Sequence, residues 1–234
     1  MPAISEFARL GARHGTVLTA GFQSAGTGRD RRPWIAPASS SLLMSVLIKT
    51  WRPLNEIPVV SLLIGDCVSR TLAEFNIQSS IKWPNDVLVG GMKICGILVR
   101  SSRSVHGDGQ DLVVGIGLNL TMGSTTEIPT ATNLEAESGF SIASEVVQNR
   151  LLVQIGGMFD DFELDDTAVR IARIDDRLAF RGELVSIDAG SRPIQGRLEG
   201  IGSDGALIVV ASDGNRQFVV SGELQRGPQQ QKPG

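Results

Sequence analysis

The hydrophobic positions of the chain follow two different patterns. In the first part of the sequence, apolar runs of strand length alternate with stretches of helical periodicity. From about Leu178 onward, short alternating segments are separated by turns rich in glycine and aspartate. Irregular alternation of strands and helices is typical of an α+β domain, and evenly spaced short strands are typical of a small β-barrel. The pattern therefore predicts a first domain over residues 1–177, a barrel over 178–226 and a disordered tail at 227–234.

The same pattern places the individual elements. We expect helices over Ser5–His14, ended by Gly15, and over Val59–Phe75 and Ser141–Phe162. The expected strands of the first domain are Thr16–Ala20, Ser41–Ile48, Ile81–Trp83, Val87–Val89, Ile94–Val99 and Leu112–Leu120. The expected strands of the barrel are Gly182–Ile187, Ile194–Ile201, Ala206–Val210 and Gln217–Val220.

Composition narrows the class of protein. The 22 basic and 25 acidic residues give a net charge of −3, which speaks against a general affinity for nucleic acid. The N-terminus lacks the pattern of a signal peptide, and every apolar run falls short of the roughly 20 residues that span a bilayer. We therefore expect a soluble, cytoplasmic protein that binds neither DNA nor a membrane. With two cysteines in no CxxC spacing and two histidines, a disulfide framework and a zinc cluster are excluded.

Three segments could carry chemistry, and the first is the polar stretch Gly21–Trp34. Gly26 and Gly28 allow backbone N–H groups to approach an anion closely. Three arginines follow within four positions, and a guanidinium binds a carboxylate or phosphate through two parallel hydrogen bonds. A solvated loop whose arginines only aid solubility is the alternative, and this segment alone does not decide between them.

The second segment, Ile81–Val99, sets charged residues inside apolar strands. Lys82, Asp86 and Lys93 must be paired or used there, because burying a lone charge is costly. Asp86 beside Asn85 offers oxygen ligands that suit Mg²⁺. The alternative is a structural salt bridge between Lys82 and Asp86, with Lys93 on the surface.

The third segment is the apolar strand Gly115–Leu120. Asn119 needs a hydrogen-bond partner there, either a ligand or nearby backbone. Gly115 and Gly117 indicate that a bulky group packs against the strand. A bulged core strand with a satisfied asparagine explains the same residues.

In this order and spacing, the motifs resemble those of the biotin protein ligase family. The segment QSAGTGRDRRPW is similar to the family's biotin and adenylate loop, and KWPNDVLV is similar to its most diagnostic string. MKICGIL is similar to the family's lysine-bearing strand, and VVGIGLNL is similar to its Gly-x-Gly-Asn strand. The resemblance covers nearly the whole chain. It implies a catalytic domain like that of class II aminoacyl-tRNA synthetases, with a mixed or antiparallel sheet flanked by helices, and an SH3-like barrel after it.

The resemblance also implies a ligase reaction in two steps. The carboxylate of biotin attacks the α-phosphate of MgATP, which gives biotinyl-5′-AMP and pyrophosphate. A lysine of a biotin carboxyl carrier protein or domain, such as that of acetyl-CoA carboxylase, then attacks the mixed anhydride. Two anions meet in the first step, so the site must supply positive charge.

Family membership assigns roles to individual residues. The implied catalytic residues are Arg29, Lys93 and Asp86, of which Asp86 would hold Mg²⁺. Biotin would be bound by Gln23, Gly26, Thr27, Arg29, Lys93, Gly96 and Leu98. ATP and the adenylate would be bound by Arg29, Arg32, Trp34, Lys82, Asn85, Lys93 and Asn119, with Trp34 stacked on adenine.

The sequence departs from the family at two places. Family members carry a strand and a Ser-Thr-Asn turn before the first helix, and this chain begins almost at that helix. Thr27 stands where the family usually has arginine. Since no helix-turn-helix segment precedes Met1, we expect no repressor function. The family allows either a monomer or a homodimer.

Two other functions remain open from the sequence. A lipoate or octanoate ligase or transferase would share the catalytic fold. A degenerate homologue would bind biotin or the carrier without turnover, as the missing Ser-Thr-Asn turn would allow.

Overall fold

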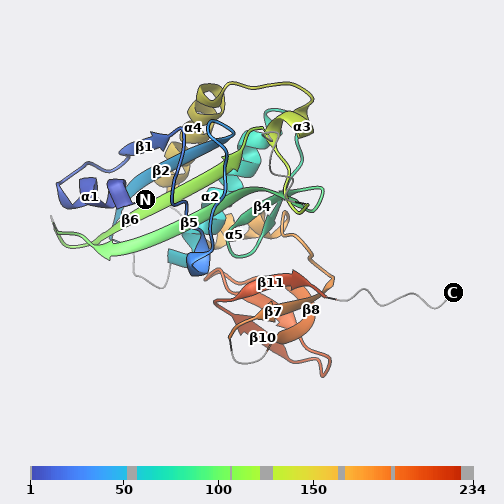
Figure 1. Ribbon diagram of the computed structural model, residues 1–234. Coiled ribbons are helices and arrows are strands. Elements are labelled where there is room, and N and C mark those ends of the chain that lie inside the picture. The colour runs from blue at the N-terminus through green and yellow to red at the C-terminus, as the bar shows by residue number, and fades with distance from the viewer. Residues whose placement is uncertain are drawn as a thin grey trace.

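Two antiparallel sheets make up the framework of the protein (Figure 1). The computed structural model describes residues 2–51, 57–105, 107–121, 129–162, 167–190 and 193–227. Apart from Gly227, the expected disordered tail lies outside these residues. Within them, no helix is both long and apolar enough to cross a membrane.

The larger sheet of the described chain has six strands in the order β1-β2-β6-β5-β4-β3. Its strands are β1 (Val17–Ala20), β2 (Ser41–Thr50), β3 (Ser80–Lys82), β4 (Asp86–Val89), β5 (Met92–Arg103) and β6 (Gln110–Asn119). Each neighbouring pair is antiparallel. The expected strands are therefore confirmed to within a few residues at their ends, in a purely antiparallel sheet.

Helices cover the two faces of this sheet unequally. The helices are α1 (Pro2–Arg9), α2 (Ile57–Ala73), α3 (Leu134–Ser138), α4 (Ser144–Phe162) and α5 (Thr167–Asp175). On one face, α2 and α4 share the main hydrophobic core with the even-numbered residues of β2 (Figure 1). On the other face, Ile4 and Ala8 of α1 pack against Leu47 and Val113. The rest of that second face is left free to form a cavity.

The smaller sheet has five strands in the order β10-β9-β8-β7-β11 within the described residues. Its strands are β7 (Leu184–Asp188), β8 (Ile194–Ile201), β9 (Leu207–Val210), β10 (Arg216–Val219) and β11 (Glu223–Arg226). The indole Nε1 of buried Trp83 donates to the Gly205 carbonyl at 3.0 Å, and the Ile201 N–H donates to Asp175 Oδ1 at 3.0 Å. Specific buried contacts therefore fix the smaller sheet against the larger unit.

The helices were predicted less well than the strands. The first was expected over Ser5–His14 but spans Pro2–Arg9. Gly11, at φ +88°, ends it one turn before Gly15. The last long helix begins at Ser144 instead of Ser141, and α3, α5 and β11 were not predicted.

Candidate functional site

The arginine-bearing loop folds back on itself as a tight hairpin. The Trp34 N–H donates to the Gly26 carbonyl at 2.9 Å, and the Gly28 N–H donates to the Arg32 carbonyl at 2.8 Å. A Cβ atom at Gly26 would lie 2.4 Å from the Trp34 carbonyl oxygen. Gly26 is therefore required for closure of the hairpin, and it does not itself line the cavity.

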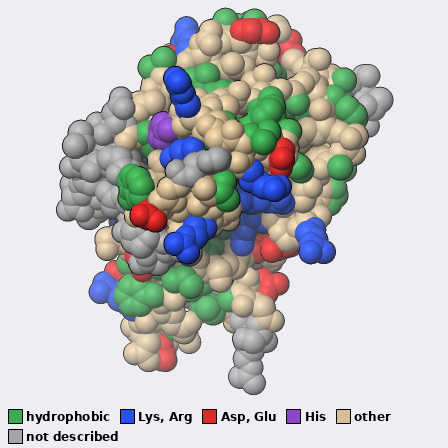
Figure 2. All heavy atoms as spheres, turned by 90° about the vertical axis from the view of Figure 1, so that its left-hand side faces the viewer, with side chains coloured by type: hydrophobic (Ala, Val, Ile, Leu, Met, Phe, Trp, Pro, Cys, Tyr) green, Lys and Arg blue, Asp and Glu red, His purple; other side chains and the backbone are tan. Residues whose placement is uncertain are grey.

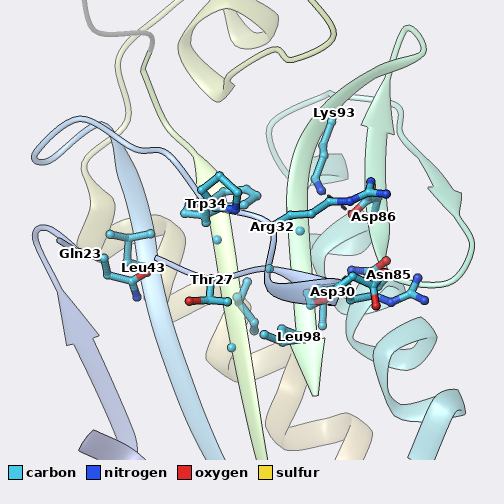
Figure 3. Close-up of a pocket in the computed structure, with 18 of the residues that line it drawn as sticks. Gln23, Thr27, Asp30, Arg32, Trp34, Leu43, Asn85, Asp86, Lys93 and Leu98 are labelled. Carbon is cyan, nitrogen blue, oxygen red and sulfur yellow. Dashed lines mark hydrogen bonds and ion pairs between the residues drawn. The ribbon is translucent and has the colours of Figure 1, made fainter. Parts of the chain in front are cut away.

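Two opposed glycines form a flat floor on which Trp34 lies. Gly96 of β5 stands opposite Gly117 of β6 in the strand register. A Cβ at Gly117 would lie 2.6 Å from Trp34 Cζ2, and one at Gly96 would lie 2.9 Å from Cζ3. The sequence predicted a bulky group against this strand. Among the described residues, that group is the indole of Trp34 (Figure 3).

A β-bulge brings Lys93 onto the same face as Gly96. The pairing of β4 with β5 slips between Val87 and Leu88, so consecutive residues Ile94 and Cys95 are both fully buried in the main core. One extra residue on a strand reverses the side to which the earlier side chains point. Lys93 therefore faces the cavity, and burial raises the pKa of the Cys95 thiol and keeps it inert.

Lys93 and Asp86 form an ion pair at this end of the cavity (Figure 3). Lys93 Nζ lies 2.6 Å from Asp86 Oδ1 and 5.4 Å from the centre of the Trp34 ring. The partner of Asp86 is thus Lys93, so the alternative of a Lys82–Asp86 bridge with Lys93 on the surface was wrong. Lys82 instead lines the cavity.

The backbone of Lys93 is held by a neighbouring segment. Its N–H donates to the Thr130 carbonyl at 2.8 Å, and its carbonyl accepts from the Thr132 N–H at 2.9 Å. Asn119 Nδ2 donates to the Thr132 carbonyl at 3.0 Å. Asn119, expected to bind the nucleotide, is not among the residues that line the cavity, and here it braces the segment that holds Lys93.

The end of the smaller sheet holds two arginines of the loop. Arg29 Nη1 donates to the Gly222 carbonyl at 3.1 Å, and Arg32 Nη1 donates to Glu223 Oε1 at 2.8 Å. The hydrogen bond from Arg32 lowers the pKa of Glu223 below its ordinary value, and the charges of Arg32, Lys82 and Arg29 act in the same direction. Glu223 was not assigned from the sequence, although it lies in the Ser-Gly-Glu ending of the barrel.

These elements enclose a cavity of about 530 Å³, a volume typical of small-molecule sites. Most of the residues predicted for the site line it: Gln23, Thr27, Arg29, Arg32, Trp34, Lys82, Asn85, Asp86, Lys93, Gly96 and Leu98. The predicted residues that do not are Gly26 and Asn119, which support its walls. Three segments distant in the sequence, together with β11, thus converge on one cavity.

One face of the molecule carries several basic side chains. The chain carries a net charge of −3, yet several Lys and Arg side chains gather on the face that Figure 2 turns toward the viewer. Local excess of one sign raises the concentration of oppositely charged solutes near a surface. Such a face would favour anionic substrates.

The donor set around Asp86 can be compared with the needs of a metal ion. Among the described residues, no three His, Cys, Asp or Glu side chains come together as a metal site. Mg²⁺ in nucleotide sites uses one or two carboxylates together with waters and phosphates. Asp86, beside Asn85 on the cavity wall, fits an ion that binds together with a nucleotide, and not one that the protein holds alone.

Comparison with known proteins decides the family. The model of the biotin/lipoate A/B protein ligase family matches residues 6–119. The biotin–[acetyl-CoA-carboxylase] ligase of Paracoccus denitrificans is 31% identical over 214 residues, which are 86% of this chain and 86% of that protein. The chain belongs to the biotin/lipoate A/B protein ligase family.

Other members show how far the similarity extends. The structure of the Aquifex aeolicus biotin protein ligase in complex with biotin and ATP has a TM-score of 0.83 and 28% identity, over 95% of this chain and 94% of that one. The bifunctional ligase/repressor BirA of Bacillus spizizenii is 34% identical over 154 residues, or 63% of this chain. The match spans only 47% of that relative's length.

Proposed function

We propose that the chain is an ATP-dependent biotin protein ligase that forms biotinyl-5′-AMP and transfers biotin to a lysine of a carrier domain. The observation that carries this proposal is the convergence of Lys93, Arg29 and Arg32 on one cavity beside a side-chain-free floor. The Aquifex relative, which matches along nearly the whole chain, has been solved with biotin and ATP.

The first step of this reaction determines what the site must supply. A biotin carboxylate and the α-phosphate of ATP repel each other, and the repulsion grows as they approach. Lys93 and Arg29 would lie between the two anions, and Arg32 would bind the remaining phosphates. Fixed cations aimed at developing charge contribute about 3–4 kcal/mol for a single well-placed donor.

The floor and walls would arrange the two substrates. Gly96 lets Trp34 and Lys93 lie close to the sheet, and Gln23, Thr27 and Leu98 would surround biotin. Trp34 would stack on adenine, with Lys82 and Asn85 beside it. Gly26 and Asn119 would act indirectly, through the hairpin and the backbone of Lys93.

Asp86 would hold Mg²⁺ through the carboxylate oxygen that does not face Lys93. When bound, the ion neutralises phosphate charge. Asp86 also keeps the Lys93 ammonium in place, because the two groups are only 2.6 Å apart. This positioning of Lys93 by Asp86 does not require a bound metal ion.

We also propose an acceptor, a domain assignment and a cellular compartment for this protein. The acceptor would be the carrier domain of a biotin-dependent carboxylase, as the name of the Paracoccus relative indicates for that protein. We assign residues 1–177 to a catalytic domain like that of class II synthetases and 178–226 to an SH3-like domain. The reaction would take place in the cytoplasm.

A second candidate is lipoate ligation, because the matching family model covers both acids. Purified protein should therefore be incubated with ATP and biotin, lipoate or octanoate, and released pyrophosphate measured. We expect release with biotin, followed by biotin transfer to a purified carrier domain. Release with lipoate alone would identify the second candidate. Binding of biotin without release would identify a non-catalytic homologue.

A further inference from the structure

The register of the sheet orders the cavity face into rows that run away from Lys93. The first row contains Gly96 and Gly117, on which Trp34 lies. The next contains Leu98, with Ser45 and Gly115 on the neighbouring strands.

The row after that contains Arg100, Val113 and Leu47. Val113 and Leu47 are covered by α1, so the cavity ends here on its β2–β6 side. Pro2, the first residue of α1, lines the cavity at this end.

Two polar side chains in these last two rows have no partner in the described part of the chain. Arg100 is exposed and lines the cavity, and its guanidinium forms no hydrogen bond or ion pair with a described residue. Ser45 also lines the cavity and is only 6% exposed. Its hydroxyl likewise has no hydrogen bond to a described residue. Both side chains are therefore available to donate hydrogen bonds to a molecule in the cavity.

We propose that Arg100, assisted by Ser45, determines which acid the cavity accepts by donating hydrogen bonds to an acceptor group at the end remote from the carboxylate. In biotin this acceptor is the carbonyl oxygen of the cyclic urea. Gly96 and Arg100 are four residues apart on β5, or about 13 Å at the rise of a strand, and Lys93 Nζ lies beside Gly96. An extended acid can therefore reach both cations. This inference rests on the proposed function.

The test compares Arg100→Ala with Arg103→Ala in the full chain. Both arginines lie on β5, but Arg103 does not line the cavity. We expect Arg100→Ala to raise Kd and KM for biotin about 10- to 100-fold, the range for hydrogen bonds to a charged group, with KM for ATP unchanged. Arg100→Lys should restore part of the affinity, Ser45→Ala should weaken biotin by a smaller factor, and Arg103→Ala should leave biotin binding intact.

The possible results distinguish failure of the role of Arg100 from failure of the proposed ligase function. Unchanged biotin affinity in Arg100→Ala, or equal losses for biotin and ATP, would overturn the role of Arg100 and leave the proposed function standing. If the unmodified chain binds no biotin by calorimetry, both fail together. Circular dichroism confirms that each variant is folded.

Discussion

The two sources of positive charge in the site are held in different ways. Lys93 stands on β5, and its position is set by strand register, a bulge and the ion pair with Asp86, all within the larger sheet. Arg29 and Arg32 stand on a loop, and they are held by the Gly222 carbonyl just before β11 and by the Glu223 side chain at its start.

Because of this difference, Lys93 is held in one position, whereas the loop arginines can change theirs. A lysine built into a sheet keeps its place whatever the loop does. Arg32 can exchange Glu223 for phosphate, because this ion pair is solvated and such a pair is weak. Lys93 is therefore suited to stay at the reacting atoms while the loop closes over substrates.

Removing the fixed cation should have the largest effect. We predict that Lys93→Ala lowers biotinyl-adenylate formation by at least about 100-fold, since a preorganised donor at developing charge is lost. Pyrophosphate exchange measures the rate. Arg103→Ala, on the same strand, is the control and should remain active, and thermal melting of both variants should stay close to that of the parent. A parallel loss of activity and folding would make Lys93 a structural lysine.

Filling the glycine floor should have the next largest effect. A Cβ at Gly117 would lie 2.6 Å from the Trp34 ring, so Gly117→Ala must displace the indole. We predict about a tenfold loss of adenylate formation, equivalent to about 1.4 kcal/mol, and a change in tryptophan fluorescence. Gly156→Ala on α4, where a Cβ meets nothing within 4 Å, is the control. Full activity in Gly117→Ala would show that the contact has no role.

Releasing the arginine-bearing loop should reduce activity less than either substitution on the larger sheet. Glu223→Gln removes the charged partner of Arg32 and should alter KM for ATP by a few-fold while kcat changes little. The matched control is Glu199→Gln, which breaks the 2.7 Å pair with Arg216 inside the smaller sheet and leaves the loop untouched. Identical kinetics in the two variants would mean that the contact between sheet and loop does not act on nucleotide binding.

The smallest effect should be a dependence of stability on pH. The pKa of Glu223 is lowered in the folded protein, mainly by the hydrogen bond from Arg32. Its contribution is therefore present above the unfolded carboxyl pKa of about 4.3 and is lost as pH falls through the lower folded value. The difference in free energy of unfolding between the parent and Glu223→Gln, measured with urea, should shrink from pH 6 toward pH 3. A difference that grows on acidification would contradict this assignment.

Sequence patterns predicted the strands of the larger sheet well because most of them are apolar runs of strand length, of which β2 is buried on both faces. The short helices were missed because α3 has only five residues and α5 only nine, so each offers few positions from which a helical period can be read. The first helix was placed too far along the chain because two glycines, Gly11 and Gly15, both adopt positive φ, and the earlier one ends it.

The sequence predicted which residues belong to the site better than it predicted which of them contact one another. Lys93, Asp86 and the arginines were selected because charges among apolar or glycine-rich neighbours need partners. The pairing of Lys93 with Asp86 depends on the bulge at Ile94, which has no local signature in the sequence. Glu223 is 191 residues from Arg32, so only the fold brings them together. Asn119 was assigned to the nucleotide by the family resemblance, and its backbone partner, Thr132, could not be identified from the sequence because it lies on a separate segment.

One measurement tests the central claim most directly: detection of biotinyl-5′-AMP by mass spectrometry after incubating the purified chain with biotin, ATP and Mg²⁺. We predict that the parent chain accumulates the adenylate, that Lys93→Ala forms almost none, and that Arg103→Ala matches the parent. No adenylate from the folded parent chain would contradict the proposal that this cavity joins the two anions.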